Sequence, residues 1–328
     1  MRGKALVFAL LLAVVFPWFM ILVLENIPGD GTSKVRQQMQ TDGENRQRRE
    51  DGYEPLTLPV ILGDGNTQTM ALEDYLVGVV LGEMPADFSQ QALMAQAVVA
   101  RTYTLKHSLG QGKHDGGALC TDSGCCQAYR APEDFLASGG STENLERIMA
   151  AVADTQWQVL LYDGELNDAT YFSCSGGRTE DAVAVWGQDV PYLQAVDSPG
   201  EEGATHFVDT VRFSVSEFAQ KLGIDHNSWA LGAVTYTDGG GVATMQIGGK
   251  TFTGVELRQL LGLRSTSFIM SAVGDQIIVT TRGFGHRVGM SQYGADAMAV
   301  RGSAYDAILA HYYPGTTLET WDAAQFKN

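Results

Sequence analysis

The chain has 328 residues, of which 45% are hydrophobic. This is enough to build a hydrophobic core and argues against intrinsic disorder. Its 38 acidic and 22 basic residues leave a formal net charge of −16, which would repel nucleic acids and anionic lipid head groups, so a nucleic-acid partner is not expected.

The N-terminal segment predicts a membrane anchor. Arg2 and Lys4 precede an uncharged apolar run, residues 5–24, and about 20 such residues in a helix span the hydrocarbon core. No A-x-A-like cleavage site follows, which favours an uncleaved anchor over a signal peptide. Basic residues before the run and acidic residues after it predict a single-pass protein, with residues 1–4 as a cytoplasmic tail and the remainder outside the cell membrane.

Residues 25–55 are polar, charged and almost free of large aliphatic side chains, which predicts a flexible tether. Residues 56–328 contain no internal repeat and no second linker of comparable length. We expect them to form one extracytoplasmic domain, within which residues 200–275 are a candidate subdomain.

Helix and strand signals alternate irregularly after the tether, and this favours a single mixed domain of the α+β class, with antiparallel strands and short helices. The first predicted elements are a helix that starts near Leu72 and ends before Pro85, a helix over 90–107 capped by Ser89, and a hairpin with an Asp163-Gly164 turn. Short strands are predicted within 234–252, and capping boxes at 214–217 and 253–256. The last predicted elements are strands over 268–273 and 276–281 and helices after Gly289 and Ser303.

Glu83, in the stretch LGEMP, is the first candidate for chemistry. A helix that ends before Pro85 places Glu83 in its last turn, where unpaired carbonyl groups disfavour a carboxylate. Apolar neighbours would also raise its pKa, and a protonated carboxyl can act as a general acid. An ordinary exposed glutamate at a helix end explains the same pattern, and the stretch alone favours that simpler interpretation.

Arg101 and Tyr103 lie in a stretch of mostly small residues, AQAVVARTY. The alanines allow close approach of a neighbouring backbone, and the Arg101 guanidinium could bind a ligand hydroxyl or carboxylate. A packed helix with one surface arginine is the alternative.

Four candidate metal ligands gather in the segment KHDGGALCTDSGCCQAY: His114, Cys120, Cys125 and Cys126. Zinc binds three or four such nitrogen and sulfur atoms at tetrahedral positions. A disulfide with Cys174 is the main alternative, since the compartment can be oxidising. The pattern favours a metal over the disulfide.

Two glycine-rich stretches, residues 171–193 and 283–299, carry hydroxyl, amide and aromatic groups that suit a neutral, hydroxyl-rich ligand such as a sugar. Neither contains the pattern of a phosphate-binding loop. His286 by itself is equally well explained as a structural histidine. The residues expected to contact the ligand are Arg101, Tyr103, Ser173, Gly177, His286 and Gln292.

Six segments, in chain order, are LEDYLVGVVLGEMP, ALMAQAVVARTYTL, CQAY, FSCSGGRTEDAVAVWGQDVPYLQAV, GFGHRVGMSQYGA and ILAHYYPGT. Together they resemble the stage II sporulation protein D family of endospore-forming bacteria, which also contains amidase-enhancer proteins. The resemblance runs from about Leu72 to Thr316 and includes the N-terminal anchor.

This resemblance implies a membrane-anchored lytic transglycosylase that cuts the β-1,4 bond between N-acetylmuramic acid and N-acetylglucosamine in peptidoglycan strands without stem peptides. The family acts during forespore engulfment, from the mother-cell membrane that faces the engulfing septum, with an amidase/endopeptidase and a membrane scaffold protein as partners. Glu83 is then the catalytic acid and base. The alternative is a glycan-binding protein without catalytic activity that activates a cell-wall amidase.

The implied reaction needs one carboxylate, because the sugar's own C6 hydroxyl attacks in place of water. A hydrolase normally needs two, and the nearest second carboxylate, Asp87, lies beyond Pro85. Hydrolysis is therefore less favoured.

The chain departs from the family pattern in two places. Cys125 stands where many relatives carry histidine, so the implied zinc ligands are Cys120 and Cys126, completed by His114 or Cys125. Arg287 stands where the family commonly has glycine, and a positive φ would be costly for arginine. We therefore expect this loop to differ from its usual conformation.

Overall fold

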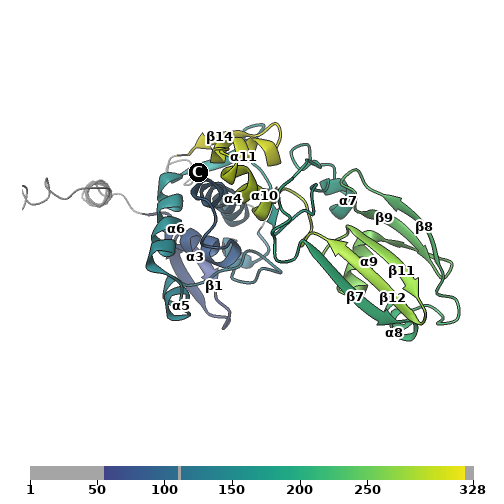
Figure 1. Cartoon of the computed structure of the whole chain (residues 1–328). Coiled ribbons are helices and arrows are strands. Elements are labelled where there is room, and N and C mark those ends of the chain that lie inside the picture. The colour runs from purple at the N-terminus through teal and green to yellow at the C-terminus, as the bar shows by residue number, and fades with distance from the viewer. Residues whose placement is uncertain (1–54, 110–111, 322–328) are drawn as a thin grey trace, which may run out of the picture. The chain divides into compact units, whose positions relative to one another are not determined.

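Helices and strands alternate along residues 55–109 and 112–321, which the computed structural model describes (Figure 1). The predicted α+β class, with antiparallel strands and short helices, is confirmed. The predicted anchor over 5–24 lies outside the described residues, as do the cytoplasmic tail and nearly all of the tether. Of the helices in the described ranges, none combines the length and apolar character needed to cross a membrane.

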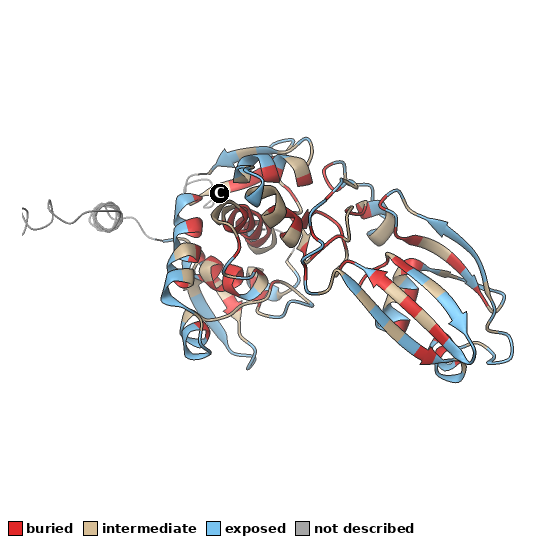
Figure 2. Ribbon diagram, viewed as in Figure 1, coloured by how far each residue is buried: buried red, intermediate tan, exposed pale blue. Residues whose placement is uncertain are grey.

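Helix α4 (Gln90–Leu109) lies at the centre of the first hydrophobic core. It contacts α3 (Leu72–Glu83), α6 (Thr142–Asp154), α10 (Gln292–Val300) and α11 (Tyr305–Tyr312), which Figure 1 shows around it. Residues 95–105 are all buried, and they form part of the red helix in Figure 2. Small side chains along α4 allow this close packing of neighbours. The helices predicted near 72–84 and 90–107 are confirmed.

Short sheets surround this helical core. One has the order β2-β1-β3, with β1 (Thr57–Ile61) antiparallel to β2 (Thr67–Ala71) and parallel to β3 (Leu119–Cys120). Another has the order β14-β4-β5, and β6 pairs with β13 in parallel. The remaining elements of this part are β4 (Gln158–Tyr162), β5 (Glu165–Leu166), β6 (Tyr171–Phe172), β13 (Met290–Ser291), β14 (Thr317–Thr320), α5 (Pro132–Ala137), α7 (Ala182–Trp186) and a 3-10 turn, η1 (Asp115–Gly117).

The predicted hairpin forms between β4 and β5, where Tyr162 pairs with Glu165. Asp163 and Gly164 both have positive φ, 52° and 82°. Two such residues in succession make the turn that matches the twist of adjacent antiparallel strands.

A second hydrophobic core lies between residues 213 and 279 and includes Phe218, Leu257 and Ile277. Its sheets have the orders β11-β12-β7 and β10-β9-β8. Their elements are β7 (Val208–Ser214), α8 (Val215–Leu222), β8 (Leu231–Tyr236), β9 (Val242–Ile247), β10 (Lys250–Thr253), α9 (Gly254–Leu261), β11 (Phe268–Val273) and β12 (Gln276–Arg282). This core overlaps the candidate subdomain over 200–275, whose boundaries remain a prediction.

Of the two capping boxes predicted in this part of the chain, that at 253–256 forms completely, and that at 214–217 forms only its serine cap. Ser214 caps α8, and its side chain accepts a hydrogen bond from the Glu217 N–H. Thr253 and Glu256 form a complete capping box at the start of α9. Along β12 buried and more exposed residues alternate, as expected for a strand with one face on a core.

Candidate functional site

Glu83 is the last residue of α3. Met84, which follows it, is extended at φ −125° and ψ 139°, as the residue before a proline tends to be. The loop that contains Ala128 and Tyr129 crosses this end of the helix, and Gly82 makes the crossing possible: a Cβ on Gly82 would lie 2.9 Å from the Ala128 carbonyl carbon. Glu83 is partly buried beside this loop.

The Glu83 carboxyl has two hydrogen-bond partners. The Ala128 N–H donates to its Oε1 atom over 2.5 Å, and its second partner is the Tyr171 hydroxyl. Burial raises the pKa of Glu83 above its ordinary value, although both hydrogen bonds act in the opposite direction. The predicted direction is confirmed, and burial is its main cause. Asp87 is exposed and is not among the causes of this shift.

A chain of polar side chains continues inward from Tyr171. Its hydroxyl donates to Gln127 Oε1 over 3.1 Å, and Gln127 Nε2 donates to Thr104 Oγ1 over 2.9 Å. Gln127 and Thr104 are both buried. Sequence reasoning missed Tyr171 and Gln127 as site residues, although Gln127 lies in the segment CQAY that carried part of the family resemblance and Tyr171 begins the glycine-rich stretch 171–193.

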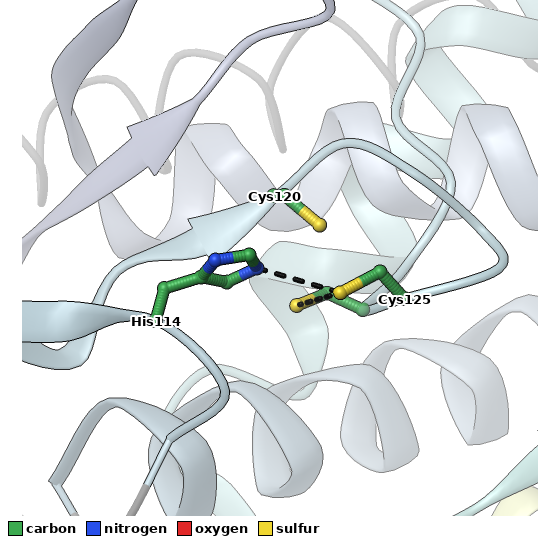
Figure 3. Close-up of side chains that lie close together, drawn as sticks. His114, Cys120 and Cys125 are labelled. Carbon is green, nitrogen blue, oxygen red and sulfur yellow. Dashed lines mark hydrogen bonds between the residues drawn. The ribbon is translucent and has the colours of Figure 1, made fainter. Parts of the chain in front are cut away.

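The four candidate metal ligands come together, as Figure 3 shows for His114, Cys120 and Cys125. Their ligand atoms all lie within 4.8 Å of one another. Cys120 ends β3, His114 precedes η1, and Cys125 and Cys126 lie on a turn where both N–H groups donate to the Asp122 carbonyl. In a tetrahedral zinc site, bonds of about 2.0 to 2.3 Å separate the ligand atoms by about 3.5 Å. The cluster therefore fits a metal ion after small side-chain movements.

Thiol chemistry in the cluster also suits a metal. Burial raises the pKa of Cys120, but hydrogen bonds from the Asp122 backbone and from Cys125 and His114 outweigh it and lower this pKa to about 7. A thiolate, the form that binds metals, is therefore accessible near neutral pH. Cys120 and Cys174 are both free thiols, so the alternative disulfide is not formed in this structure.

One short loop connects the cluster to Glu83. Cys125 and Cys126 are followed directly by Gln127, which contacts Tyr171, and by Ala128, which contacts Glu83. An ion held by the two cysteines would therefore also hold the hydrogen-bond donor of Glu83 in place.

Arg101 lies inside the domain with its side chain completely buried. Its Nε and NH2 atoms donate to the Glu73 carboxylate over 3.0 and 2.6 Å. The remaining donors bond to Thr155 Oγ1 and to the Gln158 and Val152 carbonyls. All five donors are used within the protein, which leaves none for the predicted ligand.

Tyr103 is also buried, at 8% exposure. Its ring packs against His107 with 4.1 Å between the ring centroids, and burial raises the pKa of its hydroxyl. This tyrosine lies close to the cysteines, whose charges add to that shift.

Ser173 and Gln292 are brought together by the parallel pairing of β6 and β13, in which Phe172 lies opposite Ser291. Gln292 is 5% exposed, and its Nε2 atom has no hydrogen-bond partner among the residues that the structure describes. Gly177, at φ 116°, accepts a hydrogen bond from the Ser198 N–H.

His286 lies between two aromatic rings. Its ring centroid is 5.6 Å from that of Phe172 and 5.3 Å from that of Trp186, and a hydrogen bond joins it to the Tyr171 backbone. Burial, helped by the positive charge of Arg258, lowers the pKa of His286 to about 4. The imidazole is therefore neutral at physiological pH. Trp186, by contrast, is 45% exposed.

Arg287 adopts the positive φ, 69°, that the sequence marks as costly for a residue other than glycine. Its guanidinium is buried and donates to the carbonyl groups of Ser175, Arg178 and Gly239 over 2.7 to 2.8 Å. These hydrogen bonds offset the backbone cost of a left-handed arginine. That the loop differs from the family's usual conformation stays a prediction.

Glu201 is a buried carboxylate that sequence reasoning did not identify. It accepts hydrogen bonds from the Ser175 and Gly176 N–H groups and from the hydroxyls of Ser175, Ser198 and Ser291. Because every bond fixes a neighbouring loop or the start of α10, we assign Glu201 a structural role. No local signal separates it from exposed Glu202 beside it.

A groove of about 1040 Å³ lies beside Tyr129 and does not include Glu83. Its lining carries four carboxylates, those of Asp64, Asp74, Glu133 and Asp134. None of the predicted substrate contacts lines this groove.

Comparison with known proteins identifies related sequences. A family model described as "Stage II sporulation protein" matches residues 64–162. The chain is 40% identical over 276 residues to stage II sporulation protein D of Bacillus subtilis (strain 168), covering 82% of this chain and 80% of that protein. The Bacillus amyloliquefaciens protein of the same name is 39% identical over the same shares. An amidase enhancer of Bacillus subtilis (strain 168) is 29% identical over 75% of this chain and 40% of its own length.

Proposed function

The chain belongs to the stage II sporulation protein D family, and we propose that it is a lytic transglycosylase that cleaves peptidoglycan glycan strands during forespore engulfment. The observation that carries this proposal is the state of Glu83. This carboxyl ends a helix, is partly buried and has a raised pKa. The raised pKa favours the protonated form, which is the form that a general acid needs.

The reaction begins when protonated Glu83 donates its proton to the oxygen between N-acetylmuramic acid and N-acetylglucosamine. The bond from C1 of N-acetylmuramic acid to this oxygen breaks, and N-acetylglucosamine leaves with a free 4-hydroxyl. The Glu83 carboxylate then takes the proton of the C6 hydroxyl, whose oxygen bonds to C1 and closes the 1,6-anhydro ring. Glu83 ends the cycle protonated, and no water is consumed.

The Ala128 N–H is suited to this cycle, since it donates to Glu83 Oε1 and would stabilise the carboxylate formed after the first proton transfer. A single carboxylate suffices. The proposed reaction needs only this carboxylate, whereas a hydrolase normally needs two.

We assign glycan contacts to Ser173, Gly177, His286 and Gln292, next to the exposed ring of Trp186. The Gln292 Nε2 atom is buried and has no partner among the described residues, and it would donate to a sugar hydroxyl or acetamido oxygen once a side-chain movement exposes it. An exposed indole offers the flat apolar face on which sugar rings stack.

The metal in this proposal is zinc, bound by Cys120 and Cys126 with His114 and Cys125. It would supply a cross-link that holds the loop from Cys125 to Ala128 in place, and the proton transfers fall to Glu83.

We further propose that residues 5–24 anchor the protein in the mother-cell membrane, with the catalytic domain facing the engulfing septum. The expected partners are a sporulation amidase/endopeptidase and a membrane scaffold protein. Similarity to an amidase enhancer supports the amidase partner and also the second candidate function, a glycan-binding amidase activator.

One experiment distinguishes these functions. The purified protein and its Glu83→Gln variant are each incubated with glycan strands stripped of stem peptides, and the products are identified by mass spectrometry. A transglycosylase yields 1,6-anhydro ends from the wild type and none from the variant. Reducing ends would indicate a hydrolase. Binding and amidase stimulation without any cleavage, equal in both proteins, would support the activator instead.

A further inference from the structure

The Tyr171 hydroxyl has two hydrogen-bond acceptors within reach, the Glu83 carboxyl and Gln127 Oε1. It carries a single proton and can donate to only one of them at a time. Burial raises the pKa of Tyr171 well above its ordinary value, so the hydroxyl keeps this proton at any pH at which the protein works.

Gln127 is held in an orientation that keeps its carbonyl oxygen toward Tyr171. Its Nε2 atom is already engaged, since it donates to Thr104 Oγ1 over 2.9 Å, and Thr104 is fully buried. An amide whose nitrogen serves one partner presents its oxygen to the other. Gln127 is thus a fixed acceptor, whereas Glu83 is an acceptor whose strength depends on its protonation.

We propose that Tyr171 is a positioning residue that changes its hydrogen-bond partner with the protonation of Glu83. It donates to Glu83 when that group is a carboxylate. When Glu83 carries its proton, the Glu83 carboxyl donates to the Tyr171 oxygen, and the Tyr171 hydroxyl turns to Gln127 Oε1. No covalent bond forms or breaks in this exchange, and Tyr171 itself neither gains nor loses a proton.

This inference rests on the proposed function, in which one carboxyl is first an acid and then a base. A partner that only donates would favour the carboxylate and weaken the acid, and one that only accepts would weaken the base. A hydroxyl with a second acceptor stabilises both forms. Such a partner is what a transglycosylase with a single carboxyl requires.

Few other groups near Glu83 and Tyr171 titrate in the working range. Tyr75 and Tyr103, which face Tyr171, have pKa values raised by burial. Burial likewise raises the pKa of Cys126, beside Gln127, to about 12, and His286 is neutral above a pKa of about 4. Cys120, in the neighbouring cluster, has a pKa of about 7, so the titration must be followed at the Glu83 carboxyl carbon itself and compared between the wild type and each variant.

The test uses two substitutions with opposite expected effects. Tyr171→Phe removes the donor to the carboxylate, so the pKa of Glu83 rises and the alkaline limb of the activity profile moves to higher pH. Gln127→Leu removes the alternative acceptor, so the hydroxyl stays on Glu83, the carboxylate is favoured and the limb moves to lower pH. Tyr171→Phe should also lower kcat about tenfold, the usual effect of losing a hydrogen bond to a charged group.

Two measurements are made on the full-length protein: the pH dependence of 1,6-anhydro product formation and a carbon-13 NMR titration of the Glu83 carboxyl, assigned with Glu83→Gln. The matched control is Tyr313→Phe, since Tyr313 is buried and its hydroxyl donates to the Thr170 carbonyl. It should leave the titration of Glu83 unchanged.

If Tyr171→Phe raises the pKa of Glu83 and Gln127→Leu lowers it, the exchange of partners is supported. If both variants shift this pKa in the same direction, or neither shifts it, the proposal is overturned. If the wild type forms no anhydro product, the proposed function fails, yet the NMR titration still decides the role of Tyr171. If Tyr171→Phe does not fold, Gln127→Leu decides: a lowered pKa of Glu83 supports the proposal and an unchanged one overturns it.

Discussion

Arg287 and Glu180 form an ion pair that is almost fully buried, with NH1 and Oε2 separated by 3.5 Å and side-chain exposures of 2% and 1%. The Glu180 carboxylate also accepts from the Thr237 hydroxyl over 2.7 Å and from the Gly239 N–H over 3.2 Å. Since Thr237 and Gly239 lie between β8 and β9, the pair joins the loop after His286 to a turn of the second core.

Arg287→Gly is expected to destabilise the protein although it relieves a positive φ. Left-handed backbone costs a non-glycine residue about 1 to 2 kcal/mol, whereas breaking a buried ion pair costs about 3 to 5 kcal/mol because one charge stays uncompensated. The net loss of about 2 kcal/mol is measurable by urea unfolding. Adding Glu180→Gln to Arg287→Gly should restore part of the lost stability. If Arg287→Gly alone is as stable as the wild type, the role assigned to the ion pair is contradicted.

Removal of the metal should loosen the loop that contacts Glu83. We expect the purified protein to contain about one equivalent of zinc, and Cys120→Ala to lower this content strongly. Chelation should reduce both thermal stability and glycan cleavage. Cys174→Ala is the control, because Cys174 is buried outside the cluster and should leave the metal content unchanged. Elemental analysis that finds no metal in the wild type would refute the site.

Arg101 should prove structural, contrary to the ligand contact expected from the sequence. Arg101→Ala leaves Glu73 without its partner and should cost about 3 to 5 kcal/mol in unfolding free energy. Glu73→Ala should cost a similar amount. If Arg101 instead bound glycan, Glu73→Ala would leave KM unchanged while Arg101→Ala raised it, and enzyme kinetics on the fraction that folds separates the two cases.

Protonation of His286 is expected to lower the stability of the folded protein in mild acid. Its pKa is about 4 in the folded protein against about 6.5 in an unfolded chain. Between these values the unfolded state binds more protons, so stability falls as pH drops from about 6.5 to 4, by at most about 3 kcal/mol. Urea unfolding at both pH values should reveal this fall, and His286→Asn should reduce it. An equal fall in the variant would assign the effect to other groups.

Trp186 offers a test of the proposed glycan surface. Trp186→Ala should raise KM about three- to tenfold and leave kcat almost unchanged, since aromatic stacking is worth about 0.5 to 1.5 kcal/mol. Val183→Ala is the matched control, because Val183 is exposed on the same helix. Equal KM values for all three proteins would exclude Trp186 from the glycan contact.

Local features were determined by the sequence alone. The end of α3 before Pro85, the Asp163-Gly164 turn and the cap at Thr253 each depend on residues a few positions apart. Such short-range preferences act wherever the segment lies in the fold. The spacing of His114 and the cysteines belongs to the same class, since all four lie in one short segment, residues 114–126.

The tertiary structure decided which distant residues come together and which charged side chains are buried. Glu83, Gln127 and Tyr171 belong to three distant segments, and only packing around α4 makes them neighbours. The same packing buried Arg101 against Glu73 and surrounded Glu201 with donors. Whether a charged side chain faces a ligand or is buried with a partner depends on which distant elements cover it. Periodicity and composition do not carry that information, because burial is a property of the assembled fold.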